Sequence, residues 1–406
     1  MSKGNRGFST TGLRRMRDVL TRHVESGRIP GLVALVSRDG ETHVEAIGTM
    51  RHDGGAPMRR DTIFRMASTS KPLGVSAGMV LLDECRLRLD DSVEPWLPEL
   101  ADRRVLKRPD SPLDETVPAD RAITVRDVLT CRFGLGVDLT RPDTPVQAAL
   151  QELELTGQAA PMPAPDEWMR RLGTLPLSHQ PGEHWQYHLG CDLLGVLVAR
   201  VTGQTYETFL RERVFTPLGM RDTGFHVPAG DIDRLPPAYA PDPRTGEFIV
   251  WDEPVGGRYS APPAFTAGGG GMVSTVDDYH AYFRMLLNQG THGNERILSR
   301  PAVALMTTNH LTPAQSAARD ALIDHPVAFG LSRHGGWGLG MAVRTHRSDY
   351  ASVGQFGWDG GTGTTTHADP EQRLVGILLT QTGMSTADSP RLIRDFWTMT
   401  YQAINA

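Results

Sequence analysis

Ser68 and Lys71 are the residues of this sequence whose types and spacing most clearly allow chemistry. They form a Ser-x-x-Lys motif. In a helix, side chains with this spacing lie on one face, so the hydroxyl and the amine could share a proton. Only three of the 42 Lys and Arg residues are lysines. Arginine cannot release its proton in a protein, whereas lysine can, so Lys71 is a candidate base for a nucleophilic Ser68. The alternative is that the Ser-x-x-Lys motif occurs here by chance, and only the other motifs of the chain can distinguish these two explanations.

The expected position of Lys71 favours its neutral form. Pro72 fits only in the first turn of a helix, which places the start of an apolar helix near Ser68. The dipole at a helix N-terminus and burial both disfavour a positive charge. We therefore expect a lowered pKa for Lys71, which would let it accept the proton of Ser68.

A second serine, Ser76, matches another catalytic pattern. Residues 74–78 read Gly-Val-Ser-Ala-Gly, which fits the G-x-S-x-G nucleophile elbow. An elbow requires a strand before the turn, whereas residues 70–73 belong to the same apolar helical run. We interpret the small residues as allowing close helix packing.

Tyr187 is a candidate for a third catalytic group. It lies between Pro181 and Gly190, just before an expected helix, where it could project into a cleft and pass a proton to a leaving group. Taken by itself, Tyr187 is better explained as a packed or hydrogen-bonded tyrosine than as a catalyst. His184 and His188 are four residues apart, a spacing found in zinc sites, but no glutamate follows His184 and no third ligand is apparent. We predict no metal.

Composition narrows the class of protein. The chain has 406 residues, 39% hydrophobic and 22% charged, with a net charge of −5, so no nucleic-acid partner is expected. Three widely spaced cysteines suggest neither a disulfide framework nor a zinc site. The first fifteen residues lack an apolar core, and the longest apolar stretch is too short to span a bilayer. We predict a soluble cytoplasmic protein without membrane contact, although removal of a signal peptide would leave the same picture.

Strand signals occur at the two ends of the chain and are scarce between them. Helices are expected at 13–24 and from 389, and strands at 31–37, 42–48, 338–343, 364–368 and 374–380. Four glycines, 268–271, precede a helix that we expect to be capped by Ser274; no Lys-Ser/Thr follows them, so a phosphate loop is a poor interpretation.

This order predicts a discontinuous arrangement. Residues 1–87 and 267–406 would form one α/β domain. Residues 88–266, rich in prolines and short helical patterns, would form a mostly helical domain. The active site would lie between them.

Four stretches occur in an order typical of one enzyme superfamily. They are Phe64 to Lys71, Pro181 to Tyr187, Ala267 to Tyr279, and Phe356 to Gly361. With them the chain resembles the serine β-lactamase and penicillin-binding-protein superfamily, and it is most similar to class C β-lactamases and the related family VIII carboxylesterases. The resemblance covers most of the chain. It implies a β-lactamase/transpeptidase-like fold, with an antiparallel sheet flanked by helices beside a mostly helical domain.

The resemblance also implies roles for individual residues. By position, Ser68 resembles the acylated serine, Lys71 its base partner and Tyr187 the tyrosine that shares the proton. The third motif of the superfamily, Lys-Thr-Gly or His-x-Gly, would fall on Gln355-Phe356-Gly357. The backbone N–H groups of Ser68 and Trp358 would then form the oxyanion hole, each worth about 3 kcal/mol.

Two departures concern substrate binding. Leu189 stands where β-lactamases have the Asn of Tyr-x-Asn, and neutral Gln355 stands where they have a cationic Lys. Together with Gly357 and Trp358, these are the substrate-binding residues that the resemblance implies. Both losses remove groups suited to β-lactams and peptides, and both are compatible with a plain ester.

We therefore expect a serine hydrolase that cleaves small-molecule carboxylic esters through an acyl-enzyme on Ser68, without cofactor or metal. On the same scaffold, a β-lactamase, a D-amino-acid peptidase acting on an amide, or an acyltransferase is the alternative. A non-catalytic binding protein is less favoured, because Ser68, Lys71 and Tyr187 are all present. Aromatic residues near the motifs could line an acyl pocket or belong to the core: Phe133, Trp185, Phe265, Trp337 and Trp358.

Overall fold

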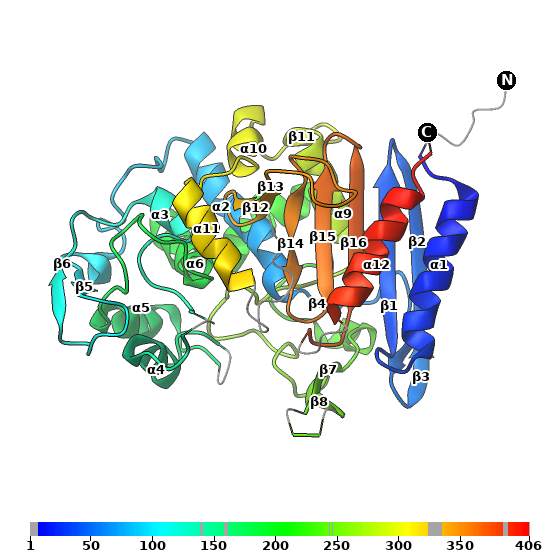
Figure 1. The fold of residues 1–406 in the computed structure, drawn as a ribbon, viewed down its shortest axis with the longest axis horizontal. Coiled ribbons are helices and arrows are strands. Elements are labelled where there is room, and N and C mark those ends of the chain that lie inside the picture. Colours follow the sequence, from blue (N-terminus) through cyan, green and yellow to red (C-terminus); the bar gives the residue numbers. More distant parts are fainter. Residues whose placement is uncertain are drawn as a thin grey trace.

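The computed structural model describes residues 7–138, 141–157, 161–242, 244–245, 247–323, 335–384 and 389–405. An eight-stranded antiparallel sheet lies at its centre (Figure 1). In spatial order the strands are β12 (Gly335–Trp337), β13 (Ala342–Arg344), β14 (Phe356–Gly360), β15 (Thr364–Asp369), β16 (Leu374–Thr380), β1 (Gly31–Arg38), β2 (Glu41–Arg51) and β3 (Gly54–Pro57). Strands from the two ends of the chain thus meet where β16 pairs with β1. The predicted fold class is confirmed.

The hairpin of β1 and β2 forms as its sequence predicts. Asp39 and Gly40 make the turn with φ values of 53° and 83°. Positive φ at both central positions is the signature of the tight turn whose twist matches that of the strands. Arg38 then pairs with Glu41, which fixes the register of the hairpin.

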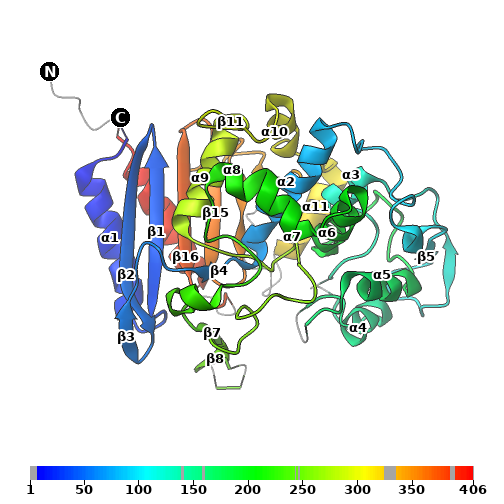
Figure 2. The same cartoon turned by 180° about the vertical axis from the view of Figure 1, so that it is seen from behind.

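Helices cover both faces of the sheet. The helices α1 (Thr10–Glu25) and α12 (Ser389–Gln402) lie over one face (Figure 1), and α9 (Val276–Leu287) and α2 (Ser70–Asp83) lie over the other (Figure 2). Successive residues of β1 therefore enter two different cores. Leu32 packs in the cluster beneath α1 and α12, and Val33 packs in the larger cluster on the opposite face. A strand buried on both faces reads as an unbroken apolar run.

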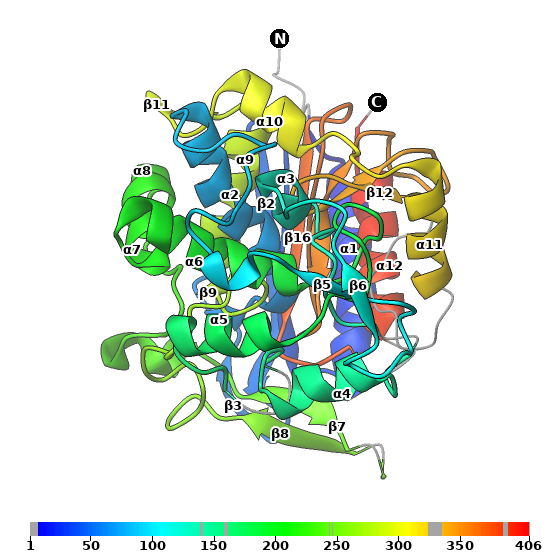
Figure 3. The same cartoon turned by 90° about the vertical axis from the view of Figure 1, so that its left-hand side faces the viewer.

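A mostly helical region lies beside the edge of the sheet where β12 to β14 are found (Figure 3). Its helices are α3 (Val125–Leu129), α4 (Pro145–Glu152), α5 (Pro165–Thr174), α6 (Leu189–Thr202), α7 (Tyr206–Leu210) and α8 (Thr216–Leu218). The strand pair of β5 (Arg104–Leu106) and β6 (Thr116–Pro118) accompanies them. A second pair, β7 (Ala238–Pro241) with β8 (Phe248–Asp252), lies below the central sheet (Figure 1), where Tyr239 bridges to Thr382. The domain boundaries near residues 88 and 266 stay a prediction.

The remaining elements follow α9. They are β10 (Thr291–His292), β11 (Glu295–Arg296), α10 (Arg300–Met306) and α11 (Pro313–Ile323). Among the described helices, none has both the length and the apolar composition that crossing a bilayer requires.

Two local predictions were wrong. The strand expected at 338–343 is interrupted, because Gly338 donates to the carbonyl of Met341 at 2.8 Å and closes a turn between β12 and β13. The cap of α9 is Thr275, whose side chain accepts from the amide of Asp278. The expected cap, Ser274, belongs instead to a short strand.

Candidate active site

Ser68 is presented by a short, fixed segment. β4 (Phe64–Arg65) pairs with β9 (Val273–Ser274), and a 3-10 turn that begins at Ala67 leads directly into α2. Ala67 has a φ of 46°, a conformation that costs a non-glycine residue roughly 1–3 kcal/mol and is common at active sites. Ser68 is partly exposed, whereas Lys71, one turn further on, is fully buried. The helix start predicted near Ser68 is correct to within two residues.

Lys71 contacts the hydroxyl of Ser68. Its Nζ donates to Ser68 Oγ at 2.9 Å and also to the carbonyl of Gly269. The same nitrogen lies 4.4 Å from the centre of the Tyr187 ring. The structure thus brings together Ser68, Lys71 and Tyr187, the three candidate catalytic residues of the sequence.

The charge state of Lys71 differs from the expectation. Burial lowers the pKa of Lys71, as predicted, but Tyr187, Cys191 and Asp192 raise it by more. The net effect is a raised pKa, so the prediction of a neutral lysine was wrong. The two acidic groups Cys191 and Asp192 come from α6, which sequence reasoning did not place beside Lys71.

Asp192 is a buried carboxylate that the sequence interpretation missed. Its Oδ1 accepts from the amide of Gly269 at 2.8 Å, and the carbonyl of the same Gly269 accepts from Lys71. His188 Nδ1 lies 3.3 Å from the other oxygen, Asp192 Oδ2. A Cβ on Gly269 would come within 2.9 Å of the carboxylate, which explains why glycine occupies this position. The row of glycines and the four-residue spacing of His188 and Asp192 were the available signals.

Trp358 holds the other side of Tyr187. Its indole Nε1 donates to the phenol oxygen of Tyr187 at 2.8 Å. The ring of Trp185 lies 5.8 Å from that of Tyr187, and the ring of Trp337 lies 4.8 Å from that of Trp358. All three tryptophans are at most 5% exposed. This hydrogen bond and the surrounding rings fix the position of the phenol oxygen.

At the position of Gly360, β14 passes close to Ser68. A Cβ on Gly360 would lie 3.4 Å from the amide nitrogen of Ser68 and 2.5 Å from the carbonyl oxygen of Met66. Alternate residues of a strand point to the same side. Trp358, two residues earlier, therefore faces the site as well, in agreement with its bond to Tyr187.

Gln355 is not brought to Ser68. Its Nε2 donates to the hydroxyl of Tyr401, and its Oε1 accepts from Arg344 Nε, at 3.0 and 3.2 Å. Tyr401 belongs to α12, on the opposite face of the sheet. An offset of three residues reverses which face of a strand a side chain occupies. The Gln355 side chain therefore points away from Ser68, and Trp358, three residues later, is the residue of this stretch that contacts Tyr187.

The amide of Trp358 does not face the site either. Gln355 accepts from the amide of Arg344 in β13 through its carbonyl, and backbone groups alternate between the two edges along a strand. Trp358, an odd number of residues away, directs its amide towards β15, where it pairs with Thr366. The expected role of this amide in an oxyanion hole is therefore contradicted. On the open edge, beyond the end of β13, the amides belong to the residues on either side of Gly360.

The other predicted residues lie in the core or against the sheet. Leu189 begins α6 and is fully buried, and Phe133 and Phe265 are 1% and 5% exposed. The ring of Phe265 packs on Trp168 at 5.1 Å. A Cβ on Gly357 would collide with the backbone of β15. A contact of Leu189 or Gly357 with substrate stays a prediction.

The contacts of Ser76 indicate a structural role. It is fully buried in α2 and shares a 2.8 Å hydrogen bond with the hydroxyl of Tyr282. A Cβ on nearby Gly78 would touch Leu129 and Leu194 at 3.1 and 3.2 Å. The small residues of 74–78 therefore allow α2 to approach α3 and α6 closely.

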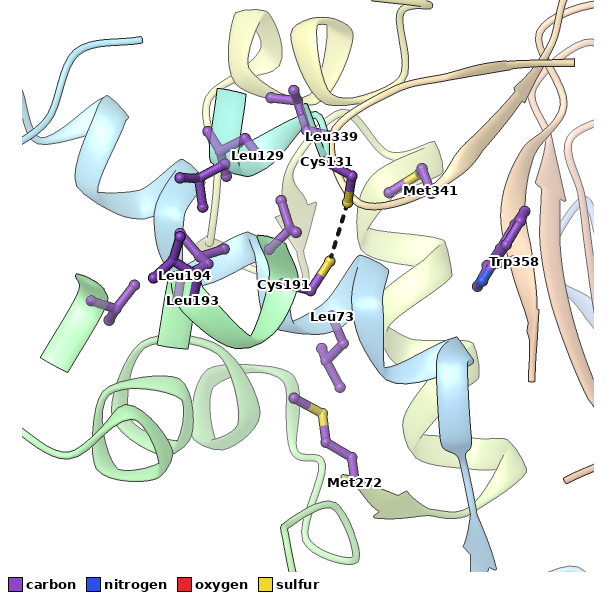
Figure 4. Packing of buried hydrophobic residues seen from close by; sticks show 14 of the residues in the cluster. Leu73, Leu129, Cys131, Cys191, Leu193, Leu194, Met272, Leu339, Met341 and Trp358 are labelled. Atoms are coloured by element: carbon purple, nitrogen blue, oxygen red, sulfur yellow. Dashed lines mark hydrogen bonds between the residues drawn. The ribbon is translucent and has the colours of Figure 1, made fainter. Parts of the chain in front are cut away.

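Two of the cysteines meet below the site. Cys131 and Cys191 face each other with their sulfur atoms 4.0 Å apart, beside Leu73 of α2 (Figure 4). Both are free thiols. The hydrogen bond with Cys191 and burial raise the pKa of Cys131 well above its ordinary value. A neutral, buried thiol is unreactive, so Cys131 acts as packing.

Comparisons with known proteins identify the family of this chain. The beta-lactamase family model matches residues 16–395. An uncharacterized protein of Mycobacterium tuberculosis is 38% identical over 88% of this chain and 87% of its own length. Esterase EstB of Burkholderia gladioli is 31% identical over 93% of both chains. The solved structure of EstCE1, described as a hydrolase with promiscuous acyltransferase activity, covers 96% of this chain and 98% of its own, with a TM-score of 0.80 and 26% identity. The chain therefore belongs to the beta-lactamase family, as a serine hydrolase.

Proposed function

We propose that the protein hydrolyses carboxylic esters of small molecules through an acyl-enzyme on Ser68. The 2.9 Å contact between Ser68 Oγ and Lys71 Nζ, with Tyr187 beside the same nitrogen, is the observation that carries the proposal. Ser68 Oγ is partly exposed, and a proton acceptor within reach of a serine hydroxyl activates it for attack on a carbonyl.

Tyr187 is the proton carrier in this proposal. In this proposal Lys71 and Tyr187 together carry one proton fewer than an ammonium and a phenol would. Ser68 Oγ bonds to the ester carbonyl carbon, and its proton fills the vacant position on the Tyr187 oxygen, which neighbours Lys71 and accepts from the Trp358 indole N–H. The proton then moves to the leaving alkoxide as the ester C–O bond breaks. Water attacks the acyl-enzyme and gives a proton to the same oxygen, and this proton returns to Ser68 as the acid leaves.

The oxyanion hole consists of two backbone amides in this proposal. One belongs to Ser68, and the other to Gly361, which follows Gly360, where an added Cβ would lie 3.4 Å from the Ser68 amide nitrogen. Gly361 takes the role first assigned to Trp358. Each donor contributes about 3 kcal/mol to the transition state.

Two positions at which the resemblance implies substrate contacts support an ester. Trp358 is the residue of its stretch that contacts Tyr187, and Leu189 stands where related β-lactamases have Asn. An indole and an isobutyl group offer neither a charge for a carboxylate nor an amide partner for a peptide. EstB, a relative over nearly the whole chain, is named an esterase.

Turnover of short p-nitrophenyl esters tests the proposal. We expect Ser68→Ala to lose at least a thousandfold in kcat, and a fluorophosphonate probe to add to Ser68 in the wild type. Ser76→Ala is the matched control, because it removes a hydroxyl from the same helix, and it should keep near-normal turnover. Undiminished turnover in Ser68→Ala would refute the mechanism. Loss of turnover in Ser76→Ala alone would identify Ser76 as the nucleophile in place of Ser68.

Acyl transfer is a second candidate, favoured by the described activity of EstCE1. An added alcohol or amine would replace water in the second step. The product ratio of ester to acid at rising alcohol concentration separates the two, and nitrocefin turnover tests the β-lactamase alternative. A cytoplasmic location stays a prediction, which cell fractionation tests.

A further inference from the structure

Two imidazoles and a carboxylate meet on the segment that leads to Tyr187. They belong to His179, Glu183 and His184, and their possible ligand atoms all lie within 4.8 Å of one another. The rings of His179 and His184 are stacked with centroids 3.9 Å apart. His184 and His188 have a spacing found in zinc sites, and we predicted no metal there; His188 lies against Asp192. The partner of His184 comes from the other end of this segment.

The backbone of this segment is held before any ion binds. The amides of Ser178 and His179 donate to the carbonyl of Gly134 at 2.8 and 3.2 Å. On the other side, Gln315 of α11 donates from Nε2 to the carbonyls of Gly182 and Glu183 at 2.7 and 2.8 Å. The backbone that carries the three side chains therefore needs no rearrangement when an ion binds, which lowers the free-energy cost of binding.

The donor atoms are available. His184 Nδ1 is buried and has no hydrogen-bond partner among the described residues, and it lies 3.9 Å from Glu183 Oε1. The side chains of His184 and Glu183 are 42% and 53% exposed, which leaves a path from solvent.

We propose that His179, Glu183 and His184 bind a zinc ion. Two imidazole nitrogens and one carboxylate oxygen are a typical zinc donor set, with water in the fourth position. Calcium and magnesium prefer oxygen ligands, which two imidazoles do not offer. Tetrahedral ligands about 2.1 Å from zinc lie about 3.4 Å apart, so rotations of the exposed Glu183 and His184 side chains complete the site.

A cobalt titration of the metal-free, full-length protein tests this site without relying on catalysis. Co²⁺ in a tetrahedral site with nitrogen ligands gives visible absorption bands, and one equivalent should saturate them. Zn²⁺ should then abolish the bands by displacement. The melting temperature should rise with added Zn²⁺, because the ion binds the folded state.

Variants identify the ligands. His184→Gln and Glu183→Gln should each weaken Co²⁺ binding at least tenfold, and the double variant H179Q/H184Q should abolish the bands. His292→Gln, which removes a histidine from β10, is the matched control and should bind as the wild type does. Melting without metal shows whether each variant is folded. Absence of bands in the wild type, or unchanged binding in a folded double variant, would overturn the proposal, whatever the esterase assay shows.

Discussion

At the scale of single residues, the behaviour of Lys71 depends on groups that are distant in the sequence. Its ammonium donates to Ser68 and to Gly269, and Gly269 in turn donates to Asp192. Asp192 thus acts in two ways: it fixes the loop that holds the amine, and its charge raises the pKa of Lys71. A buried carboxylate is a positioning residue here, because it acts through Gly269 and Lys71.

Asp192→Asn should impair catalysis more than folding. Asparagine keeps an oxygen for the amide of Gly269 but removes the charge, so the pKa of Lys71 should fall. We expect kcat to drop roughly tenfold, equivalent to about 1.4 kcal/mol, with KM little changed and the alkaline limb of the pH–rate profile moved to lower pH. Asp369→Asn, which alters another buried carboxylate on the far side of the sheet, should leave the profile in place. An unmoved profile in Asp192→Asn would contradict this role.

The sequence indicated the residues whose roles are local and not those that tertiary contacts define. Ser68 and Lys71 share one helical turn, so their spacing sufficed. The charge state of Lys71 could not be predicted, because it depends on Asp192 of another helix. Gln355 was chosen over Trp358 because strand register is invisible without the partner strand, and a shift of three residues reverses the face.

At the scale of elements, the first turn of α9 buries a carboxylate, Asp278, at a cost in free energy. Asp278 lies in its first turn and is 7% exposed, and it accepts from the amide of Asp222 and the hydroxyl of Thr223 at 2.9 and 2.8 Å. Burial nevertheless raises the pKa of Asp278 to about 6. Its hydrogen bonds join α9 to the loop after α8, which packs over β4 and β9.

Asp278→Asn should change how stability depends on pH. The folded state binds the proton of Asp278 more tightly than the unfolded chain does, so the wild type loses stability as the pH rises from about 4 to about 6. The asparagine variant lacks this loss. Between pH 4 and pH 7, the difference in unfolding free energy should shift by roughly 1–3 kcal/mol in favour of the variant, as measured by urea denaturation. Asp277→Asn, which changes the exposed neighbour, should show no such shift, and a parallel response of the two would count against the assignment.

At the scale of the whole molecule, the sheet separates two hydrophobic cores. The smaller one lies under α1 and α12, which come from opposite ends of the chain, and the larger one extends from the sheet into the helical region that carries Tyr187. The fold class was predictable because strand signals cluster at the two ends. The strand order was not, because pairing between β1 and β16 leaves no local pattern.

Phe396→Ala should therefore affect stability and spare chemistry. Phe396 of α12 is fully buried in the smaller core, and such a truncation costs about 3–5 kcal/mol. Urea unfolding measures the loss. Turnover per folded molecule should stay close to that of the wild type, since Ser68 lies on the other face. Arg391→Ala, at an exposed position of the same helix, should change stability by less than about 0.5 kcal/mol.

The pairing of β1 with β16 has a consequence for biosynthesis. Val33 of β1 pairs with Leu379 of β16, so β1 has no partner on that edge until nearly the entire polypeptide has left the ribosome. Until then the nascent chain exposes an apolar strand edge, which invites aggregation. The Ser68 segment is translated early, but β14, which completes the site beside it, is translated much later. Every shortened translation product that ends before β14 should therefore be catalytically silent and dependent on chaperones.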